Sequence, residues 1–363
     1  MFLTKTSLGS VMAALALGAS VNAAAITITS STFVQQGDIN AALIGTGLQT
    51  NVIGFAYAGN KFVGSVYINN PQLYQTNLSG GGVTTFGSPI PGGYDELYVS
   101  ASLGLGGFPN RDIYASAGPG NGGLYHFSND GTTQGFFTVT GATSLNAEYV
   151  KGIAFDPYGN YGYDMLVSTN AGNLYRVNSS GVATLLANVA PGLTLEGIDF
   201  APPGFGPVGG QAVVASETAN TLYAVSATGT VTDLSSLGVS TPGAEEIGFV
   251  PLDLGSGGSL EGFYAAAYPQ GGILKFGASQ FAGMLGDAIV TNEFGSWDIY
   301  DIHWNGSTFG VTTIGNFPNQ PEDGIFVTQA IITGGGTIPE PTTIALFGIG
   351  LAGLGFSRRR KLH

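Results

Sequence analysis

The 363-residue sequence contains no cysteine, and only 9% of its residues are charged. Without cysteine, the fold has no disulfide bond and no thiolate chemistry. The three histidines, His126, His303 and His363, are too few and too scattered for a histidine-rich zinc site. No Gly-x-Ser-x-Gly segment is present, which disfavours a hydrolase built around a nucleophile elbow.

Basic residues are scarce in the middle of the chain. Residues 26–337 hold five of them and 22 of the 23 acidic residues, which gives a formal charge of −17. A body this acidic repels phosphate backbones, so nucleic acid is disfavoured as a partner. Divalent cations, cationic ligands and neutral sugars remain compatible with the charge, and acidity by itself also keeps a protein soluble.

Glycine and apolar residues are abundant instead. Sixty glycines and 44% apolar residues argue against a long-helix or coiled-coil protein. The glycines have no three-residue collagen period, and the apolar content is too high for a disordered chain. The length fits two or three domains or one large β-domain.

The N-terminus has the organisation of a secretory signal peptide over residues 1–25. Lys5 provides the charged start, 8–21 is the apolar core, and Ala23–Ala25 offers small residues for cleavage. An uncleaved membrane anchor is the alternative, which the short, Ala- and Gly-rich run disfavours. We therefore expect an exported protein.

The C-terminus carries a second targeting pattern over 338–363. Pro339, Glu340 and Pro341 precede an apolar stretch, 344–356. The stretch predicts a transmembrane helix, and the basic residues behind it would hold that end in the cytoplasm. Those basic residues are Arg358, Arg359, Arg360 and Lys361.

This tail closely resembles the PEP-CTERM sorting signal of Gram-negative bacteria in order, spacing and terminal position. The resemblance implies that an exosortase is a partner, which cleaves near Pro339–Pro341 after an inner-membrane intermediate. It further implies release from or attachment to the cell surface, often beside exopolysaccharide production, with exopolysaccharide or other surface proteins as partners. It implies nothing about the activity of the body.

The body between the two signals repeats about every fifty residues. Each copy has turn residues, a Leu-Tyr pair or its equivalent, a short strand, another turn and a β-branched strand. The first apolar position of the copies falls at 73, 124, 174, 222, 273 and 325. The six copies together span nearly the whole length between the targeting signals.

A second repeated unit lies 20 to 25 residues ahead of several copies. It reads Gly-Ile-Ala-Phe-Asp-Pro at 152–157 and recurs at 197–202 and 246–251. With the apolar strand between the units, each repeat holds four short strands, which is the signature of a β-propeller blade. The sequence therefore predicts an all-β, six-bladed propeller over residues 26–333; an array of β-sandwiches is the alternative architecture.

The ends of the body predict how the ring closes. The sixth repeat ends after the segment 324–332, which we take as its third strand, and lacks a fourth. Residues 26–33 alternate apolar and polar positions and would supply the missing strand in the last blade. Closure of this kind removes exposed sheet edges. Residues 334–337 would form a flexible linker to the sorting tail.

The Gly-Ile-x-Phe-x-Pro strands resemble those of NHL-type and gluconolactonase-type six-bladed propellers. The Glu196-Gly197 pair resembles the Glu-Gly pair that begins the metal site of the gluconolactonase type, a site that also needs Asn and Asp ligands from other blades. Other acids also precede the predicted inner strands, Glu148 and Glu245 among them. Such a carboxylate ring could hold Ca²⁺, whereas solvated loop ends are the simpler interpretation.

Two aromatic groups are also candidates for function. Tyr158, Tyr161 and Tyr163 lie in one loop beside Asn and Asp residues and could stack on a sugar ring, although tyrosine also packs at blade edges. Trp297 and Trp304 flank a segment that we take as an inner strand, and we expect them to fill the core between blades.

Three hypotheses about function follow. The first is a non-enzymatic surface or matrix scaffold with no required cofactor; the second is a Ca²⁺-dependent, gluconolactonase-like hydrolase. The third is a glycan-binding lectin. We expect the scaffold, with Glu148, Glu196 and Glu245 as the metal ligands to test.

Overall fold

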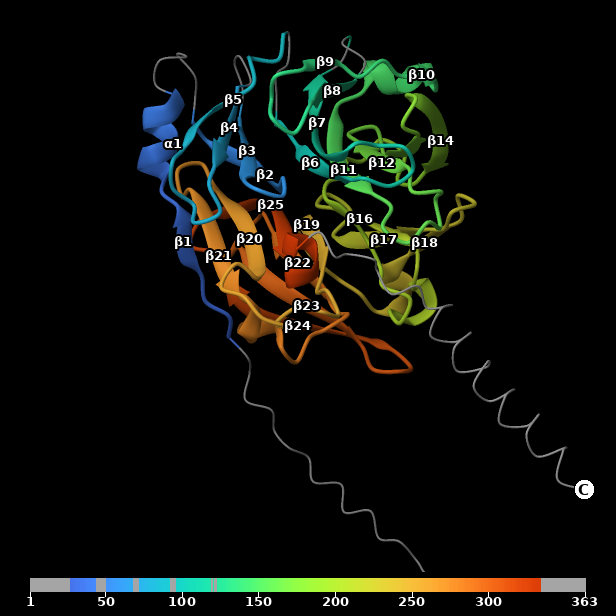
Figure 1. The fold of residues 1–363 in the computed structure, drawn as a ribbon. Helices are drawn as coiled ribbons and strands as arrows, with labels where there is room; N and C mark the ends of the chain where they lie inside the picture. Colours follow the sequence, from blue (N-terminus) through green and yellow to red (C-terminus); the bar gives the residue numbers. More distant parts are fainter. Residues whose placement is uncertain are drawn as a thin grey trace, which may run out of the picture.

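The computed structural model describes residues 27–43, 50–67, 72–91, 96–118, 120 and 123–333. Within these residues, six sheets are arranged around a common centre (Figure 1). Each sheet has four antiparallel strands, and one of them gains a fifth, parallel strand, β10 (Thr140–Gly141). The predicted all-β, six-bladed propeller is confirmed.

Each blade contributes one inner strand to the centre, and the blades are numbered here by these strands in chain order. The inner strands are β2 (Val52–Tyr57), β6 (Val99–Leu103), β11 (Val150–Phe155), β15 (Ile198–Phe200), β19 (Ala244–Phe249) and β25 (Gln320–Val327). Each inner strand contacts the next, and β25 contacts both β19 and β2. The ring of inner strands is therefore closed.

The remaining strands lie successively farther from the centre in each blade. From blade 1 to blade 6, the second strands are β3 (Phe62–Val66), β7 (Asn110–Gly118), β12 (Met165–Thr169), β16 (Ala212–Ser216), β22 (Ala288–Asn292) and β20 (Gly262–Tyr268). The third strands are β4 (Leu73–Thr76), β8 (Gly123–Phe127), β13 (Asn173–Val177), β17 (Thr221–Val225), β23 (Asp298–Trp304) and β21 (Ile273–Gly277). The outer strands are β5 (Thr84–Phe86), β9 (Gln134–Phe136), β14 (Val182–Asn188), β18 (Val231–Asp233), β24 (Phe309–Asn316) and β1 (Ser31–Val34).

The two ends of the described chain meet in blade 6. Strand β1 pairs antiparallel with β21, and β25, which contains Ile325, forms the inner strand of the same sheet (Figure 1). The predicted closure by the N-terminal segment is confirmed, but the strand spans Ser31–Val34 and not 26–33. The prediction of a third strand over 324–332 was wrong, because 324–327 belong to the inner strand β25 and 329–332 belong to the helix α2 (Gln329–Thr333).

Blades 5 and 6 exchange strands, which the repeat did not predict. After β19 the chain crosses to blade 6 for β20 and β21, returns to blade 5 for β22 to β24, and crosses again for β25. Strand β23 is consequently a third strand, so Trp297 and Trp304 do not flank an inner strand. Both tryptophans nevertheless pack against the apolar clusters between blades, as expected.

The core consists of six apolar clusters, one between each pair of neighbouring blades. Successive residues of one strand enter different clusters: Val213 of β16 packs toward blade 5, whereas Val214 packs toward blade 3. This follows from the period of two in a strand, which points alternate side chains to opposite faces. Because both faces are buried, the second strand β16 is apolar except for Ser216 at its end.

Glycine in the repeated Gly-Ile unit is required by the crowding at the centre. A Cβ on Gly152 would lie 2.7 Å from the carbonyl oxygen of Glu196, and one on Gly197 would lie 2.2 Å from Oε2 of Glu246. The first contact comes from the residue that lies two positions before the inner strand β15, and the second comes from the inner strand β19. Only glycine allows neighbouring inner strands to approach this closely.

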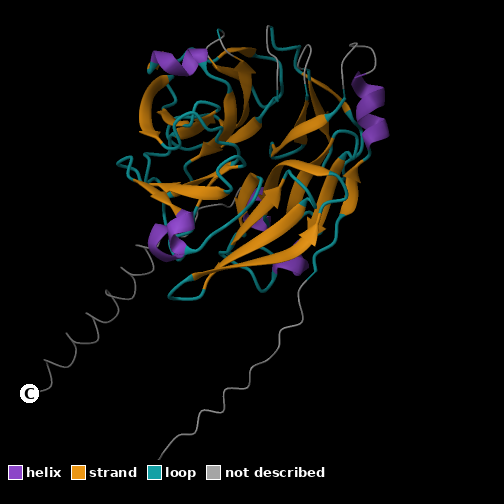
Figure 2. Ribbon diagram, turned by 180° about the vertical axis from the view of Figure 1, so that it is seen from behind, coloured by secondary structure: helices purple, strands orange, loops and turns teal. Residues whose placement is uncertain are grey.

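Helices are few and short among the described residues (Figure 2). They are α1 (Gln36–Leu43), α2 (Gln329–Thr333) and the 3₁₀ turns Thr143–Ala147, Gly206–Val208, Leu234–Leu237 and Ala278–Phe281. None of the helices in the described ranges has the length and apolar character needed to cross a membrane. The predicted spanning stretch, 344–356, lies outside those ranges.

Ring closure gives the first prediction. Val34 of β1 is fully buried between blades 6 and 1, whereas Thr32 on the same strand is exposed. Val34→Asp should lower the free energy of unfolding by about 3 kcal/mol or more, because it buries a charge without a partner. Thr32→Asp should change it by no more than about 0.5 kcal/mol. Urea unfolding measures both, and equal effects would contradict a closure that depends on β1.

Candidate functional site

Acidic side chains gather where the inner strands of blades 4, 5 and 6 begin. The members of this carboxylate cluster are Glu196, Glu217, Glu245, Glu293 and Glu322. Glu196 precedes β15, Glu245 lies in β19, and Glu322 lies in β25. Glu217 and Glu293 each follow a second strand, β16 and β22. The packing of blades 4, 5 and 6 side by side therefore brings these five residues together.

Three of the carboxylates converge on one point. One oxygen each from Glu217, Glu245 and Glu293 lies within 4.8 Å of the other two. Ca²⁺ binds oxygen at about 2.3–2.6 Å, so two ligands on opposite sides of the ion lie about 5 Å apart. The three side chains are thus spaced to bind one such ion, with no large movement.

Hydrogen bonds orient the neighbouring carboxylates. The Tyr98 hydroxyl, 2.8 Å from Glu196 Oε2 and 3.4 Å from Glu245 Oε1, can donate to either. The Gln320 amide donates to Glu293 Oε1 at 2.5 Å and to Glu322 Oε1 at 2.9 Å. Tyr98 and Gln320 come from blades 2 and 6, so side chains across the ring support the cluster.

The cluster is electrostatically unfavourable in its fully ionised form. Burial, followed by repulsion from Glu196 and Glu322, raises the pKa of Glu245 well above its ordinary value. Burial and the neighbouring Glu217 raise the pKa of Glu293 to about 8. At neutral pH these groups must therefore hold protons or bind a cation.

Further acids lie along the same inner strands. They are Asp199, Glu246 and Asp323. Burial raises the pKa of all three, that of Asp199 to about 6. The positive charge of Lys151, which forms an ion pair with Glu96, offsets only part of the rise in the pKa of Glu293 and Asp323. Carboxyl groups therefore greatly outnumber this positive charge at the described centre.

The structure brings together only two of the three metal ligands suggested by the sequence. Glu196 and Glu245 lie in the cluster, beside the same Tyr98 hydroxyl. Glu148 instead accepts hydrogen bonds within blade 3. Its donors are Thr169 Oγ1 at 2.6 Å, Asn173 Nδ2 at 2.9 Å and the Tyr175 hydroxyl at 2.7 Å. Glu148 therefore connects β12 to β13 and takes no part in the cluster.

Sequence reasoning missed Glu217, Glu293 and Glu322. The first two occupy the same place in successive blades, directly after the second strand, and aligning the second strands would have found them. Glu322 was missed because β25 was assigned to the wrong position in its blade.

The tyrosine loop does not form an exposed aromatic surface. Tyr161 is fully buried, its ring packs on Phe200, and its hydroxyl accepts a hydrogen bond from the Ala212 N–H at 2.8 Å. Tyr158 packs against the apolar cluster between blades 3 and 4, and Tyr163 is half-buried. Tyr161 in this position has no face available to a sugar.

The sorting-motif residues lie outside the described ranges, so their evidence is the sequence itself. These are Pro339, Glu340, Pro341, Arg358, Arg359 and Arg360. Residues 337–361 match the PEP-CTERM protein-sorting motif. The chain therefore carries this motif, which implies export and processing by an exosortase.

Comparison with whole proteins gives only distant similarity. No curated protein matches the chain. Catalytically inactive virginiamycin B lyase of Staphylococcus aureus with quinupristin is 11% identical, with a TM-score of 0.48 over 82% of this chain and 77% of that one. The selenomethionine form of that lyase is 13% identical, with a TM-score of 0.46 over 82% and 92%. The extracellular domain of a putative one component system from B. thetaiotaomicron is 12% identical, with a TM-score of 0.40 over 72% and 35%.

The raised pKa of Glu293 predicts an unusual pH dependence in the absence of divalent cations. Folded Glu293 keeps its proton up to a pH of about 8, whereas the unfolded chain loses it near 4.5. The folded state binds more protons in this window, so stability should fall as the pH rises through it. Melting temperatures in EDTA measure the slope.

Glu293→Gln removes one titrating group and should make that slope shallower, while the other buried carboxyl groups with raised pKa values retain part of it. Glu148→Gln is the matched control, because Glu148 lies outside the carboxylate cluster, and it should leave the slope unchanged. A wild-type protein that becomes more stable between these pH values would contradict the electrostatic account of the cluster.

Proposed function

We propose that the protein is a non-enzymatic binding scaffold at the cell surface or in the extracellular matrix, and that its propeller binds Ca²⁺ in the carboxylate cluster. The observation that carries the cation proposal is the convergence of Glu217, Glu245 and Glu293 within 4.8 Å. Oxygen-only ligands favour Ca²⁺ over zinc or copper. The sorting motif supports the location.

Export would expose the proposed Ca²⁺ site to extracellular Ca²⁺. The N-terminal signal and the motif at 337–361 would take the chain through the inner membrane to an exosortase, and then to the surface or the medium. Millimolar extracellular Ca²⁺ suits modules that bind weakly, with dissociation constants of about 10⁻⁴–10⁻³ M. Exopolysaccharide and other surface proteins are the partners we propose for the scaffold.

A Ca²⁺-dependent hydrolase of the gluconolactonase type is the second candidate, and the same convergence of oxygens favours it. Such an enzyme would use the bound cation to polarise a carbonyl or activate a water molecule. It therefore requires Ca²⁺ in the cluster before any chemistry. Failure of the cation experiment below would remove this candidate as well.

Calcium should stabilise the purified full-length protein. Saturation at about 100 times the dissociation constant should add about 2.7 kcal/mol to the free energy of unfolding. Glu245→Gln should abolish this gain in stability, because it removes one of the three converging carboxylates. Calorimetric titration and thermal melts with Ca²⁺ or EDTA measure these effects.

Glu148→Gln serves as the control for that experiment and should keep the full calcium response. It will lower the baseline stability, because the amide keeps only one of the two oxygens that accept hydrogen bonds from Thr169 and Tyr175. A calcium response that disappears equally in both variants, or is absent from the wild type, would reject the cluster as the binding site.

The sorting role has an independent test. Deletion of 338–363 should leave the body soluble and competent for export, but missing from its normal surface or medium fraction. The physical reason is the loss of both the apolar stretch and its basic end. Cell fractionation followed by immunoblotting measures the distribution, and unchanged fractions would reject the sorting role.

A further inference from the structure

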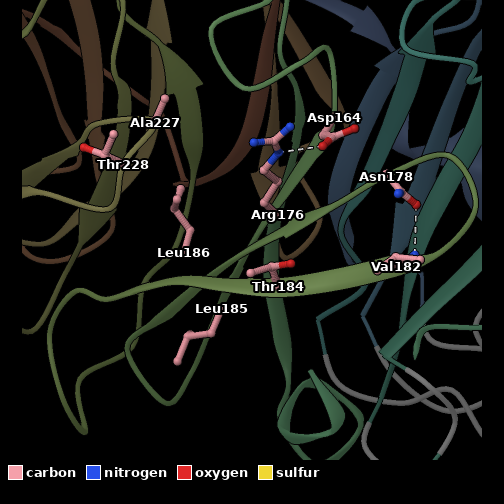
Figure 3. Close-up of a pocket in the computed structure, with 9 residues that line it drawn as sticks. All are labelled: Asp164, Arg176, Asn178, Val182, Thr184, Leu185, Leu186, Ala227 and Thr228. Atoms are coloured by element: carbon pink, nitrogen blue, oxygen red, sulfur yellow. Dashed lines mark hydrogen bonds and ion pairs between the residues drawn. The ribbon is translucent and has the colours of Figure 1, made fainter. Parts of the chain in front are cut away.

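A cavity of about 430 Å³ lies between the outer part of blade 3 and the turn that joins β17 to β18 in blade 4. Figure 3 shows Asp164 and Arg176 on one side and the turn residues Ala227 and Thr228 on the other, with Leu186 between them. The volume falls in the range of about 300–1,000 Å³ typical of small-molecule sites. The cavity is separate from the carboxylate cluster.

The ion pair in this cavity has counterparts in other blades. In blade 3, Arg176 Nε donates to Asp164 Oδ2 at 2.5 Å. Blade 2 has Asp112 with His126 at 2.8 Å, and blade 5 has Asp287 with His303 at 2.8 Å. In each case an acid at the second strand pairs with a base on the third. The pair thus connects two strands, a role that histidine fulfils as well as arginine.

Arginine at this position offers more than the connection requires. The guanidinium has five N–H donors, and the ion pair with Asp164 uses the Nε–H. The Arg176 side chain remains 38% exposed and borders the cavity. Its remaining donors can therefore reach a bound molecule without breaking the ion pair.

The rest of the lining combines hydroxyl groups with aliphatic surface. Thr184 and Thr228 supply hydroxyls that can donate or accept, and Leu186 supplies an apolar face. Sugar rings present the matching combination, hydroxyl groups around the edge and C–H groups on the faces. A site of this kind needs both donors and acceptors, which the Arg176–Asp164 pair also provides.

Charge decides which sugars fit. Asp164 cancels the positive charge of Arg176, and the body as a whole carries −17. Long-range repulsion would disfavour uronic-acid polymers. We therefore propose that this cavity binds a neutral hexose unit of a glycan, held by Arg176, Asp164 and the two threonine hydroxyls over the face of Leu186.

This site deepens the scaffold role proposed above by naming a ligand class, and it does not depend on the cation. The test uses the purified full-length protein in EDTA, with neutral gluco-, manno- and galacto-oligosaccharides and a uronic-acid oligosaccharide of equal length. Failure of calcium binding therefore leaves this result intact, and the reverse also holds.

Two variants test the cavity in different ways. Arg176→His reproduces the pairs of blades 2 and 5, so it should keep the connection between strands while removing the guanidinium. Ala227→Phe fills the cavity and leaves the ion pair untouched. Each should weaken binding of the neutral oligosaccharide at least tenfold. Ser307→Phe, in the equivalent turn of blade 5, is the matched control and should bind like the wild type.

Thermal melts show whether the variants fold. Titration calorimetry measures the affinity, for dissociation constants up to about 1 mM. Binding of a neutral oligosaccharide that is lost in both cavity variants and kept in the control supports the site. The proposal is overturned by an absence of neutral-sugar binding, by binding that survives in either cavity variant, or by binding restricted to the uronic-acid oligosaccharide.

Discussion

The pairing of β1 with β21 is the constraint on which the rest of the molecule depends. It places the first and last described strands in one sheet, so β25 can lie between β19 and β2. The apolar cluster between blades 6 and 1 is then buried, and no blade is left without a neighbour. The carboxylate cluster lies in blades 4, 5 and 6, and Glu322 reaches it because β25 lies beside β19. A chain that buries so many acids can do so only if the surrounding clusters supply enough apolar burial to offset the repulsion.

The propeller could be predicted because the residues that recur in the sequence are those that each blade needs at the same structural positions. Glycine recurs where inner strands approach closely, as at Gly152 and Gly197, and turn residues recur where hairpins need positive φ, as at Gly181. The exchange between blades 5 and 6 could not be predicted from the same signals. The strands β20 and β21 have the composition of any second and third strand, and local sequence does not reveal which inner strand they join. Only the pairing of Gly262–Tyr268 with β25 shows it.

The candidate site was predictable only in part, for a related reason. Glu148 and Glu196 both precede inner strands, and the glycine that follows only Glu196 does not reveal which of the two side chains joins the cluster. Their roles differ because Glu148 finds three donors within its own blade, whereas Glu196 lies beside Tyr98 and Glu245 from other blades. Burial and partners of this kind arise from the closed ring. The Arg176–Asp164 pair shows the same limit: its spacing resembles that of the His126 and His303 pairs, but a cavity beside it is visible only in three dimensions.

The end of β25 that leads along the chain to the sorting motif lies opposite the end that borders the carboxylate cluster. Strand β25 begins beside the cluster at Gln320 and Glu322, and it ends at Val327, directly before α2. At about 3.3 Å per residue, the strand separates these ends by roughly 20 Å. The chain continues from α2 toward the sorting motif, so a pull on that tail acts on the end of the inner strand remote from the carboxylates. Hydrogen bonds at this end, including the one from the Gln329 N–H to Glu261 Oε1 at 3.0 Å, hold α2 to blade 6. The end of β25 that leads to the sorting motif is thus well separated from the carboxylate cluster, so the processing that the motif implies does not require the cluster to change its geometry.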